Sequence, residues 1–350
     1  MSQSPRIHRN FGMELVRVTE AAALACAPFM GRGDGVAGDR AATDAMRAVL
    51  GLVEMDGEII IGEGEKDRAP RLFNGERVGA GGGPALDLAV DPLEGTRLLA
   101  TGRPNSIAVI AAAPRGALWN PGSSLYMEKL VVGAEARDAI DLQMSPRENL
   151  HRIAEALGRP VSSLTVFVLD KPRHAALIEE VRATGARVTL HSDGDVMGAL
   201  LAVVPDTGVD VLMGTGGTPE GVIAAVAVKA MGGGMLGRCD PQLDEERAAL
   251  ETELPGGALD RVLTLDDLVA GDDGFFSATA VTDSPFLEGV RYDAQHGGVT
   301  TESLVIRAGS GSVRYVRGVH RLDPEHIFGG SVAGSGADAV AHAAVRAATD

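Results

Sequence analysis

The expected fold is organised around residues 85–96, which read ALDLAVDPLEGT. The apolar first half is typical of a buried strand, and the proline and glycine that follow predict a sharp turn. In α/β proteins the functional site lies at such strand ends. The turn lets the carboxylates of Asp91 and Glu94 converge with the carbonyl of Leu93, and three oxygens in one place suit a hard divalent cation. The alternative is an ordinary proline turn with both acids in solvent.

The composition is that of an acidic globular protein. The chain has 350 residues, of which 45% are hydrophobic and 23% charged, so two packed subdomains are expected. Its formal net charge of -16 repels polyanions, and an aromatic content of 3% offers few surfaces for stacking bases. Nucleic acid is therefore excluded as a partner. Bound divalent cations would still allow a phosphate ester to bind.

Cysteine usage and hydropathy predict a cytoplasmic protein. Cys26 and Cys239 are far apart and belong to no paired motif, which argues against a disulfide framework or a zinc site. Residues 1–10 are polar and lack the apolar core of a signal peptide. The most apolar later stretches are too short to span a bilayer, so no membrane association is expected.

Two acids in the first part of the chain have both a structural and a functional interpretation. Asp39 lies at the expected start of a helix over 39–55, where it is either an N-cap or a metal ligand. Glu63 follows a short strand over 58–61, in a loop of alternating acids and glycines that suits either a cation or solvent. An earlier helix is expected over 12–30. The glycines of 79–83 predict a flexible connection, because no helix signal follows them.

The second half alternates strands and helices regularly. Ser145-Pro146-Arg147-Glu148 predicts a capping box that opens a helix ending near 157, and this marks the boundary between subdomains 1–158 and 159–327. A mobile tail is expected over 328–350. Strands are expected at 164–169, 187–190 and 209–213, and helices at 173–184, 196–204 and 219–231. This pattern predicts a mainly parallel sheet, whose strand ends bring the intervening loops to one mouth.

Residues 91–96 are similar to the signature Asp-Pro-(Ile/Leu)-(Asp/Glu)-Gly-(Ser/Thr) of the lithium-sensitive, metal-dependent sugar phosphatase superfamily. Further blocks of resemblance occur in order along the chain: 13–20, 31–34, 61–65, 171–174, 193–195, 216–221 and 300–304. With these blocks the chain resembles the class II fructose-1,6-bisphosphatases of bacteria, which belong to that superfamily. The resemblance implies an α/β protein with a layered α-β-α-β-α sugar phosphatase fold, a mixed N-terminal sheet and a mainly parallel C-terminal sheet.

The resemblance also implies the site and its chemistry. The reaction is hydrolysis of the 1-phosphate of fructose-1,6-bisphosphate in gluconeogenesis by a metal-activated water, and Mn²⁺ or Mg²⁺ fits an all-oxygen shell. The implied metal ligands are Asp39, Glu63, Asp91, Leu93, Glu94 and Glu220. The implied catalytic residues are Glu63, Asp67 and Thr96. The implied substrate-binding residues are Glu94, Gly95, Thr96, Tyr126, Lys171, Pro172, Arg173, Asp193, Gly194, Asp195 and Gly217.

Several of these residues have simpler interpretations. Glu220 in a first helical turn is favourable against the helix dipole without any function, and Tyr126 fits either core or rim. Lys171 and Arg173 are either anchors for the second phosphate or ordinary surface residues, and His174 fits a cap as well as a catalytic role.

Two related activities remain open: hydrolysis of sedoheptulose-1,7-bisphosphate, alone or together with the fructose ester, and metal or sugar-phosphate binding without catalysis. The chain departs from the family at Gly35, where a lysine is usual, and Arg40 or another cation would have to replace that charge. The family also leads us to expect a homo-oligomer, either a dimer or a tetramer.

Overall fold

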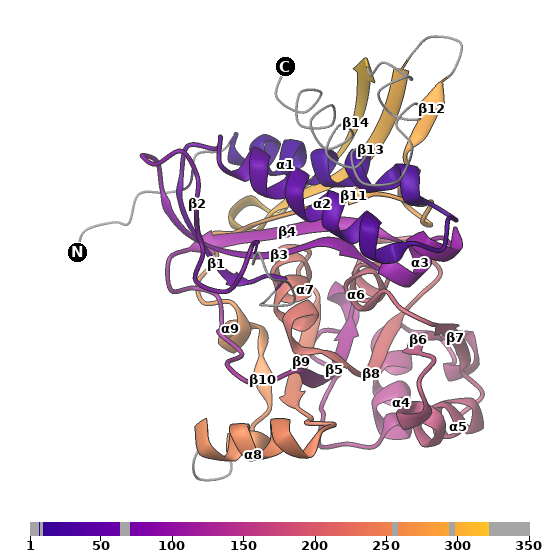
Figure 1. Ribbon diagram of the computed structural model, residues 1–350. Helices are drawn as coiled ribbons and strands as arrows, with labels where there is room; N and C mark the ends of the chain where they lie inside the picture. Colours follow the sequence, from indigo (N-terminus) through magenta and orange to yellow (C-terminus); the bar gives the residue numbers. More distant parts are fainter. Residues whose placement is uncertain (1–6, 8–9, 64–70, 254–257, 294–297, 322–350) are drawn as a thin grey trace. The chain divides into compact units, whose positions relative to one another are not determined.

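The computed structural model describes residues 7, 10–63, 71–253, 258–293 and 298–321 (Figure 1). The chain divides into two compact units. Unit 1 combines Met1–Ala117 with Asp273–Asp350, and unit 2 is Leu118–Asp272. This division differs from the expected boundary near 158, because the strands that follow residue 273 return to the first sheet and pair with the strands formed before residue 117.

Unit 1 is built on an eight-stranded mixed sheet. The strand order in the described residues is β12-β13-β11-β4-β3-β1-β2. In addition, β14 pairs with β13 over its whole length, whereas β12 and β11 pair with the first and the second half of β13. Only β1 and β3 run parallel among these pairs. The strands are β1 (Asp56–Ile61), β2 (Arg77–Val78), β3 (Ala85–Glu94), β4 (Ile107–Pro114), β11 (Phe275–Ala280), β12 (Arg291–Asp293), β13 (Gly298–Arg307) and β14 (Ser312–Arg321). At the end of the described chain, β13 and β14 form an antiparallel hairpin.

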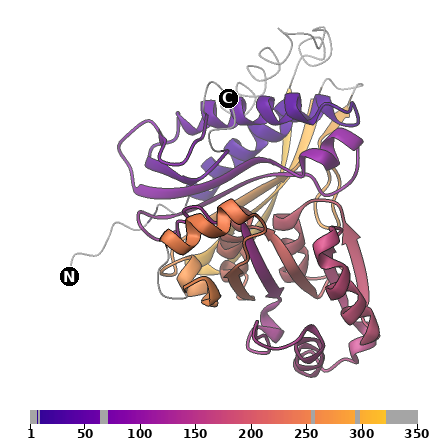
Figure 2. The same cartoon turned by 60° about the horizontal axis from the view of Figure 1, so that its bottom comes forward.

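The helices α1 (Phe11–Cys26) and α2 (Gly35–Leu50) lie side by side in both views (Figure 1, Figure 2). Both were expected, although α2 begins four residues earlier than predicted. Each helix buries one apolar face: Leu15, Val18, Ala22 and Ala25 in α1, and Met46, Val49 and Leu50 in α2. They form one apolar core with side chains of β1, β3 and β4. A short helix, α3 (Thr96–Thr101), follows β3 directly.

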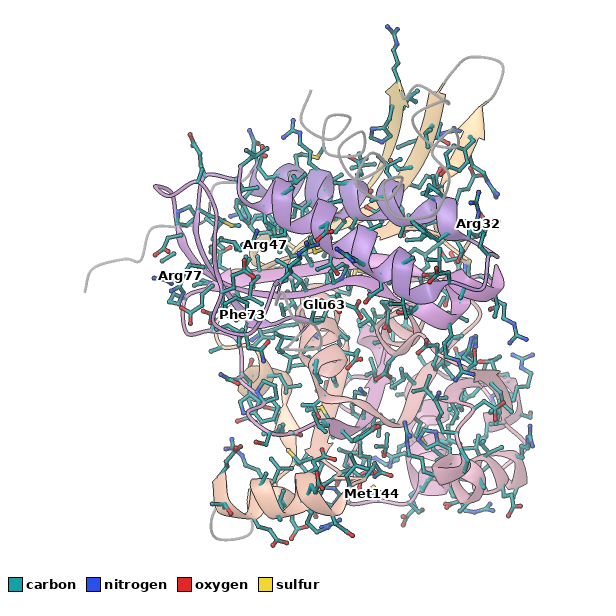
Figure 3. All side chains as sticks on the ribbon, in the orientation of Figure 1. Arg32, Arg47, Glu63, Phe73, Arg77 and Met144 are labelled. Atoms are coloured by element: carbon teal, nitrogen blue, oxygen red, sulfur yellow. The ribbon has the colours of Figure 1, made fainter. Side chains whose placement is uncertain are left out.

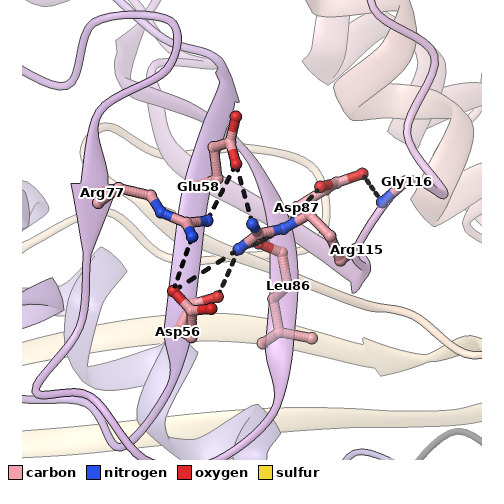
Figure 4. A network of polar contacts seen from close by, with 7 residues as sticks. All are labelled: Asp56, Glu58, Arg77, Leu86, Asp87, Arg115 and Gly116. Atoms are coloured by element: carbon pink, nitrogen blue, oxygen red, sulfur yellow. Dashed lines mark hydrogen bonds and ion pairs between the residues drawn. The ribbon is translucent and has the colours of Figure 1, made fainter.

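A network of charged side chains ties the beginnings of β1 and β3 to the end of β4 (Figure 4). Arg115 donates to Glu58 Oε2 at 2.9 Å, and its Nε lies 3.3 Å from Asp87 Oδ1. Arg77 donates to the same Glu58 oxygen at 3.0 Å. Asp87 is buried, and it also accepts a hydrogen bond from the backbone of Gly116 at 2.7 Å. The network therefore compensates a buried acid with an arginine.

Two of the family-like sequence blocks meet inside unit 1, away from the residues assigned to chemistry. The Thr301 hydroxyl donates to Glu20 Oε1 at 2.9 Å and lies 2.8 Å from His320 Nε2. All three residues are buried, and burial raises the pKa of Glu20 above its ordinary value. These blocks join α1 to β13 and β14, so they stabilise the fold.

Unit 2 contains a six-stranded sheet in the order β10-β9-β5-β8-β6-β7. Its strands are β5 (Tyr126–Val132), β6 (Thr165–Leu169), β7 (Arg187–His191), β8 (Val211–Gly217), β9 (Gly234–Cys239) and β10 (Leu263–Thr264). The sheet is mixed. Parallel pairing joins β6 to β7 and β8, as the alternating pattern predicts, whereas β5 pairs antiparallel with both β8 and β9. Only the part of the sheet formed by β6, β7 and β8 is therefore parallel, as was expected for most of the sheet. The rest is antiparallel because β5, which comes earlier in the chain, lies between β8 and β9.

The helices of unit 2 cover both faces of its sheet. They are α4 (Pro146–Ala156), α5 (Ala175–Ala183), α6 (Asp195–Val203), α7 (Thr218–Ala230), α8 (Asp244–Glu253) and α9 (Leu265–Leu268). Side chains of α4 and α5 pack with Val166 and Val168 of β6. A Cβ at Gly198 in α6 would meet Phe167, which points to the opposite face. The predicted capping box is confirmed, since Ser145 and Glu148 exchange both of its hydrogen bonds.

None of the helices in the described part of the chain combines the length and the apolar composition that a membrane crossing requires.

Candidate functional site

The strand β3 does not stop at the proline of the family-like motif. Asp91 pairs with Val109 and Glu94 with Ile107, so two residues of β3, Pro92 and Leu93, lie opposite one residue of β4. This is a β-bulge, and a bulge accommodates proline because the extra residue makes no ladder hydrogen bond. Bulges bend a strand and redirect its side chains, so this one sets the directions of the two acids.

Asp91 and Glu94 each place a carboxylate oxygen within 4.8 Å of the other. Asp91 is half-buried and also accepts the backbone N–H of Leu93 at 3.1 Å, whereas Glu94 is buried. Gly95 has a φ of 81°, a left-handed conformation that glycine adopts without strain, and it turns the chain into α3. The hydroxyl of Thr96 donates to the carbonyl of Leu93 at 3.2 Å. These oxygens form a compact donor set that suits a hard cation.

Glu63 and Asp91 lie at the same end of two neighbouring parallel strands. The parallel strands β1 and β3 pair Ile61 with Ala89, and each acid lies two residues further on. Glu63, labelled in Figure 3, is half-buried, and its backbone N–H donates to the carbonyl of Leu72 at 3.1 Å. Asp67, the other candidate for handling the proton of the attacking water, lies outside the described residues.

Asp39 is not the N-cap of its helix. Asp34 takes that position, and its Oδ1 accepts the backbone N–H of Ala37 at 3.0 Å, so the helix starts at Gly35. Asp39 therefore lies inside α2, half-buried. The same helix turn packs tightly against α3, because a Cβ built on Gly35 would lie 2.8 Å from Thr96 Cγ2.

The loops at the carboxyl ends of the parallel strands in unit 2 contact one another. Lys171 follows β6, and its ammonium donates to the carbonyl of Ser192 after β7 at 2.8 Å. Arg173 donates through Nε and Nη2 to the carbonyl of Thr215 in β8, at 3.0 and 2.8 Å. Its guanidinium also lies over the ring of Tyr126, 5.3 Å from the centroid. Lys171 and Arg173, the predicted phosphate anchors, and Tyr126, the predicted sugar contact, therefore lie together at the carboxyl ends of β6, β7 and β8. This region is called the mouth of unit 2 below.

His174 links two of the strands that end at this mouth, β6 and β8, through buried hydrogen bonds. It is buried, its Nδ1 lies 2.7 Å from the carbonyl of Leu169, and its Nε2 accepts the backbone N–H of Thr215 at 2.8 Å. This arrangement requires the neutral tautomer with its proton on Nδ1. Burial lowers the pKa of His174 below its ordinary value. The side chain thus connects β6 to β8 and is not on the surface; His174 is the N-cap residue of α5, but its side chain makes no cap hydrogen bond.

The remaining predicted residues surround the ends of β7 and β8. Gly194 has a φ of 94° and caps α6, which begins with the buried Asp195, while Asp193 precedes it and is half-buried. Gly217 is the N-cap of α7, so the helix begins one residue before the predicted start. Glu220 lies in the first turn of that helix and is half-buried. Pro172 is exposed and begins a short 3₁₀ turn before α5.

Sequence reasoning missed Lys129, which lies inside β5 and is only 2% exposed. Its ammonium forms an ion pair with the buried carboxylate of Asp195 and donates to the carbonyl of Gly217 at 2.5 Å. A lysine within the otherwise apolar half of a strand, followed by three apolar residues, was the available signal, because buried lysines require a partner.

Fold and acid-rich strand end together define an α/β protein of the layered, metal-dependent phosphatase class. The family model described as "Bacterial fructose-1,6-bisphosphatase, glpX-encoded" matches residues 9–320. The chain is 45% identical over 329 residues to the fructose-1,6-bisphosphatase 1 class 2 of Escherichia coli (strain K12), covering 91% of this chain and 97% of the relative. A class 2 fructose-1,6-bisphosphatase of Shigella flexneri matches to the same extent. The chain therefore belongs to the bacterial class 2 fructose-1,6-bisphosphatase family.

Proposed function

We propose that the chain hydrolyses the 1-phosphate of fructose-1,6-bisphosphate to give fructose-6-phosphate and phosphate, the reaction named for its relatives. The observation that carries the proposal is the pair of acids at the bulge of β3, within a chain that matches the family along nearly its whole length. Gluconeogenesis is the process that this reaction serves.

We propose that the acids at the end of β1 and β3 and in α2 hold divalent cations, and the family resemblance adds Glu220 to the ligands. One ion would be bound by Asp39 and Glu63, and another by Asp91, Glu94 and the carbonyl of Leu93, together with Glu220. The fit rests on the donor set, since carboxylate and carbonyl oxygens favour Mg²⁺ or Mn²⁺ over zinc. Such cations neutralise phosphate charge, lower the pKa of a bound water and stabilise the leaving oxygen.

Within this site, Thr96 and Glu63 orient the attacking water, and Glu63 or Asp67 accepts its proton. The hydroxyl of Thr96 is already directed by its bond to the carbonyl of Leu93. Water oxygen attacks phosphorus in line, the bond between phosphorus and the oxygen on C1 breaks, and that oxygen takes a proton to become the sugar hydroxyl. No covalent phosphoenzyme is needed.

The mouth of unit 2 would bind the rest of the substrate. Lys171 and Arg173 provide positive charge for the second phosphate, Arg173 as a planar donor and Lys171 as a point charge. Tyr126, Asp193 and Asp195 would contact the sugar, with the backbone of Pro172, Gly194 and Gly217 close to it. The hydrogen bonds of Lys171 and Arg173 to loop carbonyls support this assignment, because they fix both side chains at the mouth.

Phosphate release tests the proposal directly. The purified chain is assayed with fructose-1,6-bisphosphate, sedoheptulose-1,7-bisphosphate and fructose-6-phosphate, each with Mn²⁺, with Mg²⁺ and with a chelator. We expect metal-dependent release from the fructose bisphosphate and none from fructose-6-phosphate. A faster reaction with the sedoheptulose ester would change the substrate. Absence of release from every ester with either metal would leave only a binding role.

We further propose a cytoplasmic location and a homo-oligomer, either a dimer or a tetramer. A highly charged sugar bisphosphate does not cross membranes unaided, so its hydrolase belongs in the compartment that makes it. Val313, Tyr315 and Val319 are exposed on one face of β14, and apolar surface of this kind is typical of contacts between subunits. Light scattering of the purified protein measures the subunit number.

A further inference from the structure

Lys129 occupies an unusual place for a lysine. It lies in β5, which has β8 on one side and β9 on the other, so its backbone is in the interior of the sheet. Its side chain is almost completely buried, and burying an ammonium is costly unless the charge is paired and hydrogen-bonded. A lysine at such a position therefore depends on its partners, and its partners depend on it.

Both partners of Lys129 lie next to the loops at the carboxyl ends of the parallel strands of unit 2. Asp195 is the first residue of α6, and Gly217 is the last residue of β8. One ammonium thus joins the first residue of α6 to the last residue of β8, which are 22 residues apart in the sequence. It fixes the direction of a carboxylate and of a peptide plane at the same time.

Two glycines at the end of β8 let acidic side chains lie close to its backbone. A Cβ on Gly216 would lie 2.1 Å from Asp195 Oδ2, so the carboxylate rests directly against the backbone of β8. A Cβ on Gly217 would lie 1.7 Å from Glu220 Oε2. The two glycines therefore allow Asp195 and Glu220 to approach the backbone closely, and Lys129 holds the Asp195 side of this arrangement.

The other side-chain contacts described at the end of β8 are made with Thr215, two residues before Gly217. Arg173 binds the carbonyl of Thr215, His174 binds its N–H, and the Thr215 hydroxyl donates to Asp240 Oδ2 at 2.6 Å. Lys129 alone among these four side chains contacts both Gly217 and Asp195. A substitution of Lys129 should therefore alter the positions of Asp195 and Gly217 without removing the contacts that the other three side chains make with Thr215.

We infer that Lys129 is a positioning residue for substrate binding: its ammonium holds the Asp195 carboxylate and the Gly217 carbonyl in the geometry that receives the sugar of the bisphosphate. The inference rests on the proposed function, which places both partners at the substrate. The ion pair also cancels the charge of Asp195, so the carboxylate can accept hydrogen bonds from sugar hydroxyls without repelling the phosphates.

The test compares Lys129→Met with the wild-type chain and with Lys229→Met. Lys229 is a matched control because its ammonium also donates to a carboxylate, Asp266 at 2.7 Å, and to a carbonyl, Val269 at 2.8 Å, where α7 meets α9. The kinetic constants for fructose-1,6-bisphosphate are measured together with the thermal midpoint of each variant. Wild-type hydrolysis, measured in parallel, tests the proposed function independently of Lys129.

We expect Lys129→Met to raise KM about tenfold while kcat falls less than threefold, because the contacts to the sugar exist before and during the reaction. Lys229→Met should change the thermal midpoint and leave KM within twofold of wild type. A folded Lys129→Met variant with wild-type KM would overturn the inference, since a purely structural lysine predicts that result.

If Lys129→Met does not fold, the comparison moves to the Asp195→Asn background. The double variant buries neither charge, and replacing a buried ion pair by neutral groups is well tolerated. It still lacks the donor to the Gly217 carbonyl, so its KM should exceed that of Asp195→Asn about threefold. Equal KM values in these two proteins would overturn the inference.

Discussion

Gly35 provides a test of packing and charge at one position. A Cβ there would lie 2.8 Å from Thr96 Cγ2 and 3.1 Å from the Thr96 carbonyl oxygen, so any side chain must displace α3 or turn the threonine. Gly35→Ala adds only that Cβ, whereas Gly35→Lys adds both the Cβ and the charge that the family resemblance led us to expect here. The ratio of the kcat values of the two variants therefore isolates the effect of the charge.

The expected magnitudes follow from these distances. Overpacking costs about 1 to 3 kcal/mol, and replacing glycine in a helix returns about 0.5 to 1 kcal/mol. Gly35→Ala should therefore lower stability by about 1 kcal/mol, which corresponds to roughly 2 °C in a chain of this size. A displacement of 1 Å costs about a hundredfold in rate, so moving Thr96 by a few tenths of an ångström should reduce kcat about threefold.

The charge itself should contribute little if Arg40 or another cation already replaces it. We then expect Gly35→Lys and Gly35→Ala to differ by less than about threefold in kcat for fructose-1,6-bisphosphate. A tenfold higher kcat in Gly35→Lys, about 1.4 kcal/mol of barrier, would refute compensation. Unchanged kcat and thermal midpoint in Gly35→Ala would refute the packing argument instead.

Three further predictions concern other contacts. Arg173→Ala should raise KM about tenfold and lower kcat less than threefold, because the second phosphate is bound similarly before and during the reaction; an unchanged KM would argue against an anchor. His174 is held neutral in the folded state, so stability should fall as pH drops below about 6.5, by at most about 1.4 kcal/mol per pH unit, and thermal midpoints of His174→Gln should show less of this loss than wild type. Arg115→Met should destabilise the chain by about 2 to 3 kcal/mol in urea, because it removes the guanidinium from the buried Asp87, and a change below 0.5 kcal/mol would contradict that role.

Local patterns predicted most of the elements, because the side chains involved act over a few residues. The inward faces of α1 and α2 and the capping box at Ser145 all depend on neighbours within four residues. The position of β5 could not be predicted in this way. Its antiparallel partners β8 and β9 lie far along the chain, and no local signal distinguishes them from strands of the first sheet.

The candidate site shows the same limit. The register of β1 and β3 brings Glu63 and Asp91 to one edge, as expected from two strands that each end in acids. The sequence left Asp39 open as an N-cap or a metal ligand, and only the structure shows that Asp34, five residues earlier, takes the N-cap position. Lys129 was overlooked because its partner Asp195 is 66 residues away, so its charge looked like that of an ordinary strand residue.

The central claim is that the acids at the bulge of β3 hold the catalytic cation, and Mn²⁺ binding to Asp91→Asn tests it most directly. The measurement is isothermal titration of Mn²⁺ into the wild type, into Asp91→Asn and into the control Asp56→Asn. Asp56 is the first residue of β1 and pairs with Ala85, at the end of β3 that is opposite to the bulge. Asp91→Asn removes one ligand charge and keeps the shape, so we predict at least tenfold weaker binding, loss of hydrolysis and a thermal midpoint that is unchanged or slightly higher. Wild-type affinity and turnover in Asp91→Asn would contradict the account.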